Sequence, residues 1–189
     1  MRQIFLIRHG KPAATWGEAD EDPGLDAQGK AQAEAARDHL LSLPLDQRPN
    51  RVVSSPLRRC RETAEPTARA LGVDIEIDRR VGEIPTPSNL PAADRAAWLK
   101  QVFQGRWQDA KGDMDYVEWR DSVGRSLVDR GGTAVFSHFV AINAVMSHLT
   151  GTDQVLSFRP DHASITVLAS DGARLCLVAQ GPEASTGVL

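Results

Sequence analysis

Two histidines in this chain each follow a short apolar run. Arg8-His9-Gly10 comes directly after the apolar residues 4–7, and Ser137-His138 comes directly after residues 133–136. A neutral imidazole can attack phosphorus, and a guanidinium binds phosphoryl oxygens through two parallel hydrogen bonds without losing its charge. These residue types predict phosphoryl-transfer chemistry with a histidine as the nucleophile.

A third polar group, which includes Arg58 and Arg59, follows the apolar pair at residues 52–53. Because the carboxyl ends of neighbouring parallel strands meet at one edge of a sheet, we expect this group to join the two histidines. The charge of a phosphoryl group would then be neutralised by Arg8, Arg59 and a protonated His138, and no metal is required.

The elements that must position these residues alternate between strands and helices. Apolar runs predict strands at residues 4–7, 52–53, 73–77, 133–136, 164–168 and 174–178. Helices are predicted at about 27–43, from a Ser55-Pro56 start to Gly72 with a kink at Pro66, and at about 139–149. This order predicts an α/β fold with a mostly parallel central sheet, helices on both faces, and a final antiparallel hairpin.

Residues 85–130 differ from the rest of the chain. They begin with three prolines within seven residues and hold three of the four tryptophans, namely Trp98, Trp107 and Trp119. We expect a small helical insertion over the active site, within a single domain that spans residues 1–189. The tryptophans are expected to pack this insertion onto the sheet rather than to face a substrate.

Composition narrows the function classes. The formal net charge of -3 and the pI near 5.9 give no basic field for nucleic acid or an anionic membrane. Cys60 and Cys176 are far apart and form no CxxC pair, so they predict neither a zinc site nor a disulfide, and both are expected to be buried. The first apolar run is too short for a signal peptide or a membrane span. We expect a cytoplasmic protein that needs no cofactor.

Four motifs, in order and at similar spacing, resemble the histidine phosphatase superfamily, the phosphoglycerate-mutase-like group. Arg8-His9-Gly10 matches its signature, and residues 54–64, SSPLRRCRETA, resemble its second motif with Cys60 in place of the usual alanine. Residues 25–33 are similar to the segment before its first long helix, and Ser137-His138 resembles the start of its second catalytic half. The resemblance covers nearly the whole chain and is weakest over the insertion.

This resemblance implies roles for five residues. His9 would be the phosphorylated nucleophile, and the phosphoryl group would be held by Arg8, Arg59 and His138. Glu83 stands where the family keeps its acid, which must protonate the leaving alkoxide and then assist water. That task requires a pKa raised toward neutrality.

Some positions depart from the family pattern. Phe139 stands where glycine is frequent, Thr15 replaces a common asparagine, Lys11-Pro12 replaces Glu-Thr, and His162 stands where many relatives have asparagine. We expect phosphate binding to survive these changes, whereas substrate preference is not carried over. The remaining histidines are expected to be structural or surface residues: His39, His148 and His162.

The leading hypothesis is hydrolysis of a small phosphomonoester through a phosphohistidine. Its rivals are a mutase acting through a bisphosphate, a protein phosphohistidine phosphatase, and a non-catalytic phosphate-binding protein. The expected partner is a small-molecule phosphate ester. A homodimer is left open.

Overall fold

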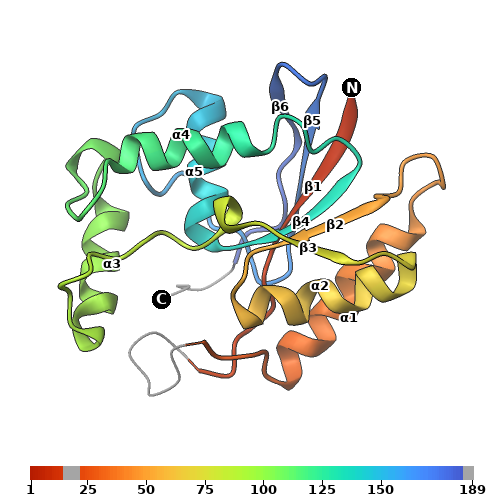
Figure 1. Ribbon diagram of the computed structural model, residues 1–189, viewed down its shortest axis with the longest axis horizontal. Helices are drawn as coiled ribbons and strands as arrows, with labels where there is room; N and C mark the ends of the chain where they lie inside the picture. The colour runs from red at the N-terminus through yellow and green to blue at the C-terminus, as the bar shows by residue number, and fades with distance from the viewer. Residues whose placement is uncertain (15–21, 185–189) are drawn as a thin grey trace.

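The computed structural model describes residues 1–14 and 22–184, and its centre is a six-stranded sheet with the order β3-β2-β4-β1-β5-β6 (Figure 1). The strands are β1 (Arg2–Arg8), β2 (Arg51–Ser54), β3 (Ile75–Ile77), β4 (Thr133–Ser137), β5 (Ile165–Ser170) and β6 (Leu175–Ala179). β3, β2, β4 and β1 are parallel neighbours, whereas β5 pairs antiparallel with β1, and β6 with β5. The predicted mostly parallel sheet with a final hairpin is confirmed.

Helices cover both faces of the sheet. They are α1 (Ala27–Ser42), α2 (Arg58–Leu71), α3 (Arg95–Gln104), α4 (Tyr116–Ser126) and α5 (Phe139–Thr150), with short 3-10 helices η1 (Arg79–Val81), η2 (Ala92–Asp94) and η3 (Trp107–Asp109). Figure 1 shows α1 and α2 on one side of the sheet and α4 and α5 on the other. The arrangement is the predicted one.

The apolar run of β1 is continuous because both of its faces are buried. Phe5 and Ile7 pack into the core beneath α1 and α2. Ile4 and Leu6 pack into the opposite core with α4 and α5. Burial on both faces fixes β1 in the middle of the sheet, so the residues that follow it lie at a central position.

Helix ends follow local sequence signals in most places. The Asp26 side chain accepts a hydrogen bond of 2.6 Å from the Gly29 amide and caps α1. Gly72 ends α2 with a φ of 68°, and Gly151 ends α5 with a φ of 69°. Glycine adopts this left-handed conformation without steric cost, which is why both helices stop there.

The predicted start of α2 at Ser55-Pro56 is wrong. The helix begins at Arg58, after an extended Leu57 that makes no side-chain cap. The Ser55 amide instead donates to the Phe136 carbonyl at 3.0 Å and continues the ladder of β2 with β4. Ser55 therefore lies just beyond β2, which ends at Ser54, and α2 runs as one helix through Pro66.

The predicted insertion, residues 85–130, contains η2, α3, η3 and α4. Trp107 is buried in the core, with its ring centroid 5.8 Å from that of Trp119, and Trp98 packs against the same core. The prediction that the tryptophans serve packing is confirmed. Phe103 of α3 lies 5.4 Å, centroid to centroid, from Phe139 of α5, so α3 contacts the helix that begins at the second histidine.

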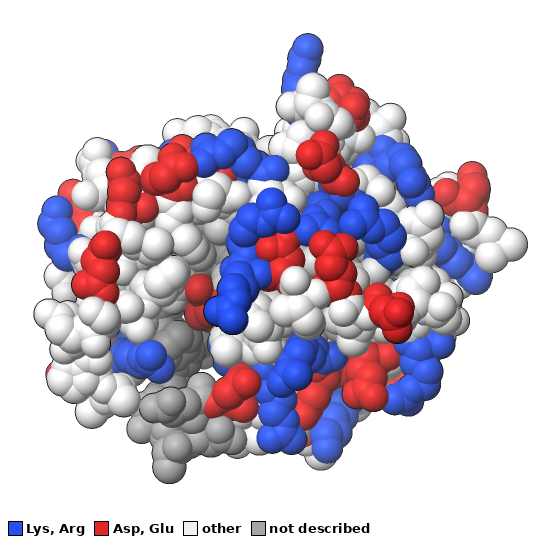
Figure 2. Space-filling model, in the orientation of Figure 1, with Lys and Arg blue, Asp and Glu red and all other residues white. Residues whose placement is uncertain are grey.

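Charged side chains of both signs are interspersed over the face drawn in Figure 2. Across residues 1–14 and 22–184, no helix combines the length and apolar character that crossing a membrane requires.

Candidate active site

The register of β1 with β4 brings the two predicted histidines together. Arg8 pairs with Ser137, so His9 and His138 follow neighbouring strands at the same level of the sheet. Their ring centroids lie 5.3 Å apart at an interplanar angle of 61°. Both side chains are buried, at 5% and 0% exposure. The carboxyl edge of the sheet therefore places two imidazoles side by side in a site of low dielectric constant.

Arg59 and Glu83 complete this cluster from two other segments. Arg59 lies in the first turn of α2, and its Nη2 is 3.2 Å from His138 Nδ1 and 3.6 Å from Glu83 Oε2. Glu83 follows η1, and its Oε2 lies 3.5 Å from His138 Nδ1. Both charged side chains are about nine-tenths buried. The structure thus brings together the five residues to which the family resemblance gives roles, once Arg8 is included. Arg58, the other arginine of the third polar group, instead forms an exposed ion pair of 2.7 Å with Glu62.

Arg8 is held from several directions. Its Nη1 donates to the Pro160 carbonyl at 2.9 Å, and its Nη2 lies 3.0 Å from His162 Nε2. Its Cζ lies 5.1 Å from the centre of the Phe139 ring, a cation–π distance. Of its three nitrogens, the buried Nε is the one without a hydrogen-bond partner among the described residues. Burial lowers the pKa of Arg8 to about 10, so the guanidinium stays charged at neutral pH.

The imidazole of His9 is neutral and has one defined tautomer. Burial lowers its pKa well below the ordinary value, and the charges of Arg59, His138 and Arg8 lower it further. Its Nδ1 lies 2.8 Å from the Gly10 carbonyl, which can only accept, so Nδ1 carries the proton. The lone pair is therefore on Nε2, the nitrogen that can attack phosphorus.

His138 has the opposite tautomer. Burial, Arg59 and Arg8 lower its pKa well below the ordinary value. Arg59 can only donate, so His138 Nδ1 accepts, and the proton of the neutral ring lies on Nε2, which is 2.7 Å from Ser55 Oγ. Burial next to two guanidinium groups disfavours a further positive charge, so the neutral form of His138 is favoured in the ligand-free site. The expectation of a protonated His138 concerns the site with a phosphoryl group bound and stays a prediction.

Glu83 shows the shift that an acid in this position requires. Burial raises its pKa, and this effect outweighs the opposing influence of Arg59, of the Ile84 amide at 3.1 Å and of Arg8. A protonated carboxyl group is therefore favoured to higher pH than in water. Such a group can donate a proton at one stage of a reaction and accept one at another.

Two glycines set the path of the chain just after His9. A Cβ on Gly29 would overlap the Lys11 carbonyl oxygen, and a Cβ on Gly10 would lie 2.6 Å from the Gly29 carbonyl oxygen. The Gly10 amide donates to Thr63 Oγ1 at 2.9 Å, which ties this loop to α2. The first turn of α1 therefore packs directly on the loop that follows His9, and only glycine permits this approach.

Three further residues at the site were not predicted to act there. His162 was expected to be structural, yet its ring centroid lies 5.9 Å from that of His9. Ser55 contacts His138, and so does Cys60, whose Sγ lies 3.3 Å from His138 Nε2. Cys60 is buried as predicted. The sequence alone held no signal for the place of His162, which follows from the structure: β5 runs antiparallel to β1, so the residues just before β5 lie beside the end of β1.

Cys176 was expected to be buried but is exposed, because β6 is the edge strand of the sheet. Thr15, which departs from the family pattern, lies outside the described residues. Lys11, in the loop that follows His9, forms an ion pair of 3.1 Å with Asp26.

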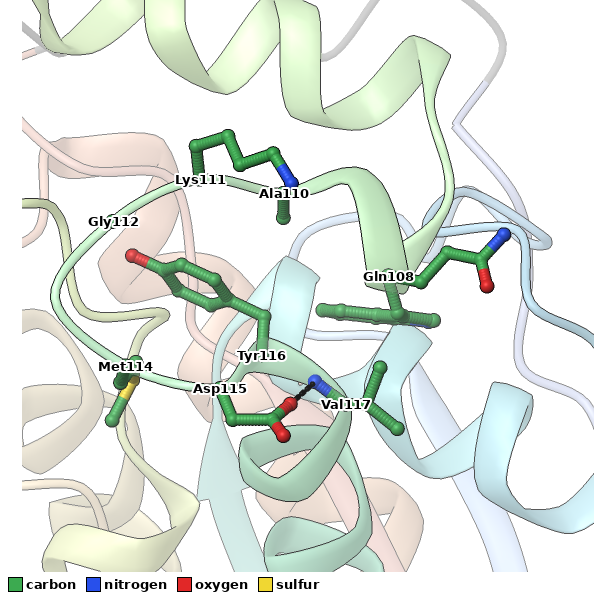
Figure 3. A pocket seen from close by; sticks show the side chains of 9 residues that line it. Gln108, Ala110, Lys111, Gly112, Met114, Asp115, Tyr116 and Val117 are labelled. Carbon is green, nitrogen blue, oxygen red and sulfur yellow. Dashed lines mark hydrogen bonds between the residues drawn. The ribbon is translucent and has the colours of Figure 1, made fainter.

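A separate hollow lies in the insertion (Figure 3). Its volume is about 370 Å³, and it is lined by Trp107, Gln108, Ala110, Lys111, Gly112, Met114, Asp115, Tyr116 and Val117. Asp115 is already engaged there as the cap of α4 through the Val117 amide. None of the predicted site residues lines this hollow. Within the described ranges, no group of three or more His, Cys, Asp or Glu side chains is placed to hold a metal ion.

Two solved structures illustrate how widely this fold is shared with known proteins. The structure of mycobacterial glucosyl-3-phosphoglycerate phosphatase matches with a TM-score of 0.71 and 22% identity, over 94% of this chain and 97% of that one. Phosphoserine phosphatase from Entamoeba histolytica, solved with 3-phosphoglyceric acid, matches with a TM-score of 0.75 and 19% identity, over 98% of each chain. The fold of this chain is therefore the fold of these phosphatases.

Sequence comparison identifies the family. The probable phosphoglycerate mutase GpmB of Salmonella choleraesuis is 27% identical over 170 residues, which cover 80% of this chain and 76% of that protein. The family model described as histidine phosphatase superfamily (branch 1) matches residues 4–181, and this match spans all five predicted site residues. The chain belongs to branch 1 of the histidine phosphatase superfamily.

Proposed function

We propose that this protein is a metal-independent phosphatase that hydrolyses a small phosphomonoester through a phosphohistidine on His9. The observation that carries the proposal is the state of His9. Its proton is fixed on Nδ1 by Gly10, so the Nε2 lone pair is available beside two arginines. A neutral nucleophile among fixed positive charges suits attack on a phosphate dianion.

In the first step, His9 Nε2 attacks phosphorus, and the bond from phosphorus to the ester oxygen breaks. Arg8 and Arg59 bind the phosphoryl oxygens, with the unused Nε of Arg8 as one donor. Glu83, kept protonated by burial, gives its proton to the departing alkoxide. The products of this step are an alcohol, phosphohistidine and a Glu83 carboxylate.

In the second step, the Glu83 carboxylate removes a proton from water while the water oxygen attacks phosphorus. The bond between phosphorus and Nε2 breaks, and the electron pair returns to His9. Inorganic phosphate leaves, and Glu83 is protonated again for the next cycle. The same carboxyl group therefore serves as acid and then as base, which its position beside His138 and Arg59 allows.

His138 is proposed to change charge when phosphate binds. Its Nε2 proton faces Ser55, so its Nδ1 is the nitrogen on the side of Arg59 and Glu83. A phosphate dianion nearby raises the pKa of an imidazole. His138 then takes a proton from solvent on Nδ1, shares it as a hydrogen bond with a phosphoryl oxygen, and returns it to solvent when inorganic phosphate leaves. This is the protonated role expected from the sequence.

The test is phosphate release from a panel of sugar phosphates, phosphoglycerates, nucleotides and an aryl phosphate in the presence of EDTA. Wild-type protein, His9→Ala and the control His39→Ala are compared, because His39 is exposed on α1. The proposal predicts turnover that resists EDTA, survives in His39→Ala and is lost in His9→Ala. The mechanism would be contradicted if EDTA abolished the activity, or if the His9→Ala variant kept it.

A phosphoglycerate mutase is the second candidate, and the similarity to GpmB favours it. Both activities share the first step and differ in the acceptor of the phosphoryl group. A mutase returns it to a phosphoglycerate, whereas a phosphatase gives it to water. Interconversion of 2- and 3-phosphoglycerate that is faster than phosphate release, and that is stimulated by a bisphosphate, would select the mutase.

A further inference from the structure

We infer that His162 is a positioning residue that holds the guanidinium of Arg8 in the orientation required to bind the phosphoryl group. The inference rests on the proposed function and adds a third histidine to the site. His162 Nε2 lies 3.0 Å from Arg8 Nη2, and the His162 side chain is 22% exposed. Its ring centroid lies 5.9 Å from that of His9.

The uncharged form of His162 can accept a hydrogen bond from Arg8. Arg8 can only donate, so Nε2 must accept and the ring proton lies on Nδ1. Burial, together with the charges of Arg8 and Lys11, lowers the pKa of His162 to about 4, against the opposing charges of Asp161 and Asp26. At neutral pH the ring is uncharged and does not repel the guanidinium it binds.

The segment around His162 is fitted closely to the end of β1. The Pro160 carbonyl accepts from Arg8 Nη1 at 2.9 Å, and the Ser164 carbonyl accepts from the Arg8 amide at 3.2 Å. The Ala163 amide donates to the His9 carbonyl at 3.3 Å. Backbone groups on both sides of His162 thus bind the backbone or side chain of Arg8-His9.

The backbone of this segment is strained at one position. Ala163 has a φ of 56°, and it is the one non-glycine residue with positive φ in the described part of the chain. This conformation is costly for a residue with a Cβ and persists only where the surroundings impose it. The Asp161 amide donates to the Pro182 carbonyl at 3.0 Å, which ties the start of the segment to residue 182. The Ser164 amide donates to the Asp161 carbonyl at 3.1 Å and closes the turn.

Together these contacts determine which donors of Arg8 remain for a ligand. Nη1 is directed to Pro160 and Nη2 to His162, while the Phe139 ring lies 5.1 Å from Cζ. The buried Nε has no partner among the described residues. Without His162, Nη2 of the guanidinium would lose its fixed partner. Phosphate would then have to orient the guanidinium when it binds, and its affinity would be lower.

The experiment compares His162→Ala, His162→Asn and the exposed control His39→Ala. Titration calorimetry gives the Kd of inorganic phosphate, and an aryl phosphate gives kcat and KM. His162→Ala is expected to weaken phosphate binding about tenfold, which corresponds to one net hydrogen bond to a charged group. Asparagine offers a carbonyl oxygen to Arg8, so His162→Asn is expected to recover most of the affinity. His39→Ala is expected to bind as the wild type does.

A double-mutant cycle with Arg8→Met separates positioning from a general structural role. If His162 acts through Arg8, Arg8→Met and Arg8→Met/His162→Ala bind phosphate equally. Equal loss from His162→Ala in both backgrounds would overturn the inference, and so would wild-type affinity in His162→Ala. If Arg8→Met does not fold, the contrast between the alanine and asparagine variants decides. Wild-type protein that neither binds phosphate nor turns over an ester would remove the proposed function itself.

Discussion

Glu83 Oε2 lies 3.5 Å from His138 Nδ1, and burial shifts the pKa values of these two groups in opposite directions. Burial disfavours the charged form of each, so the carboxyl pKa rises and the imidazole pKa falls. The pair is therefore driven toward a neutral acid beside a neutral base. The remaining positive charges of the cluster are those of Arg8 and Arg59, which match the charge of a phosphate dianion.

The substitution Glu83→Gln should slow the reaction of substrates with poor leaving groups more than that of substrates with good ones. A poor leaving group such as a sugar alkoxide needs a proton as it departs, whereas an aryl oxide does not. We expect kcat/KM for a sugar phosphate to fall roughly 100-fold or more, and that for an aryl phosphate to change by less than about tenfold. Steady-state kinetics on both substrates makes the comparison. Equal losses on the two would exclude Glu83 as the acid.

The pH dependence of kcat/KM should follow the free forms of His9 and Glu83. The first step needs neutral His9 and protonated Glu83. Because the pKa of His9 is lowered and that of Glu83 is raised, the two active forms coexist at mildly acidic pH. For a sugar phosphate, kcat/KM should fall as pH rises through the pKa of Glu83. Glu83→Gln should lack this basic limb, and its persistence in that variant would assign it to another group.

Gly29→Ala tests the packing of α1 on the loop after His9. Alanine is normally the better helix residue, by about 1 kcal/mol. Here the new Cβ would overlap the Lys11 carbonyl, so we expect a net loss of about 2 kcal/mol in the free energy of unfolding. Gly105→Ala is the matched control, because its Cβ would meet only the Gln101 and Val102 carbonyl oxygens at 3.7 Å. Urea denaturation of both variants provides the measurement, and a stable Gly29→Ala protein would contradict the close approach.

Much of the fold could be predicted from local patterns. The continuous apolar run of β1 indicates a strand buried on both faces, and Gly72 and Gly151 mark helix ends at the residues where the helices stop. The start of α2 was predicted wrongly because Ser-Pro is a favourable local start, whereas the Ser55 amide and hydroxyl bind Phe136 and His138 instead. Here a tertiary contact outweighs a local preference.

The site could be predicted less completely than the fold. His9 and His138 follow apolar runs and so are recognisable from the sequence. The role inferred for His162 depends on the pairing of β5 with β1 and on a strained turn at Ala163, neither of which a single sequence displays. The charge of His138 depends on burial and on two arginines from other segments. Charge states are properties of the assembled site and not of the motif.

The central claim is that His9 becomes phosphorylated, and trapping that intermediate tests it most directly. Glu83→Gln protein, in which attack by water is slowed, is mixed with an aryl phosphate and quenched in alkali, where phosphohistidine is stable. Peptide mass spectrometry then locates the phosphoryl group, with His9→Ala as the control. The account predicts one phosphoryl group on His9 and none in a Glu83→Gln/His9→Ala double variant. Turnover with no phosphorylated peptide, or with the phosphoryl group on another residue, would contradict it.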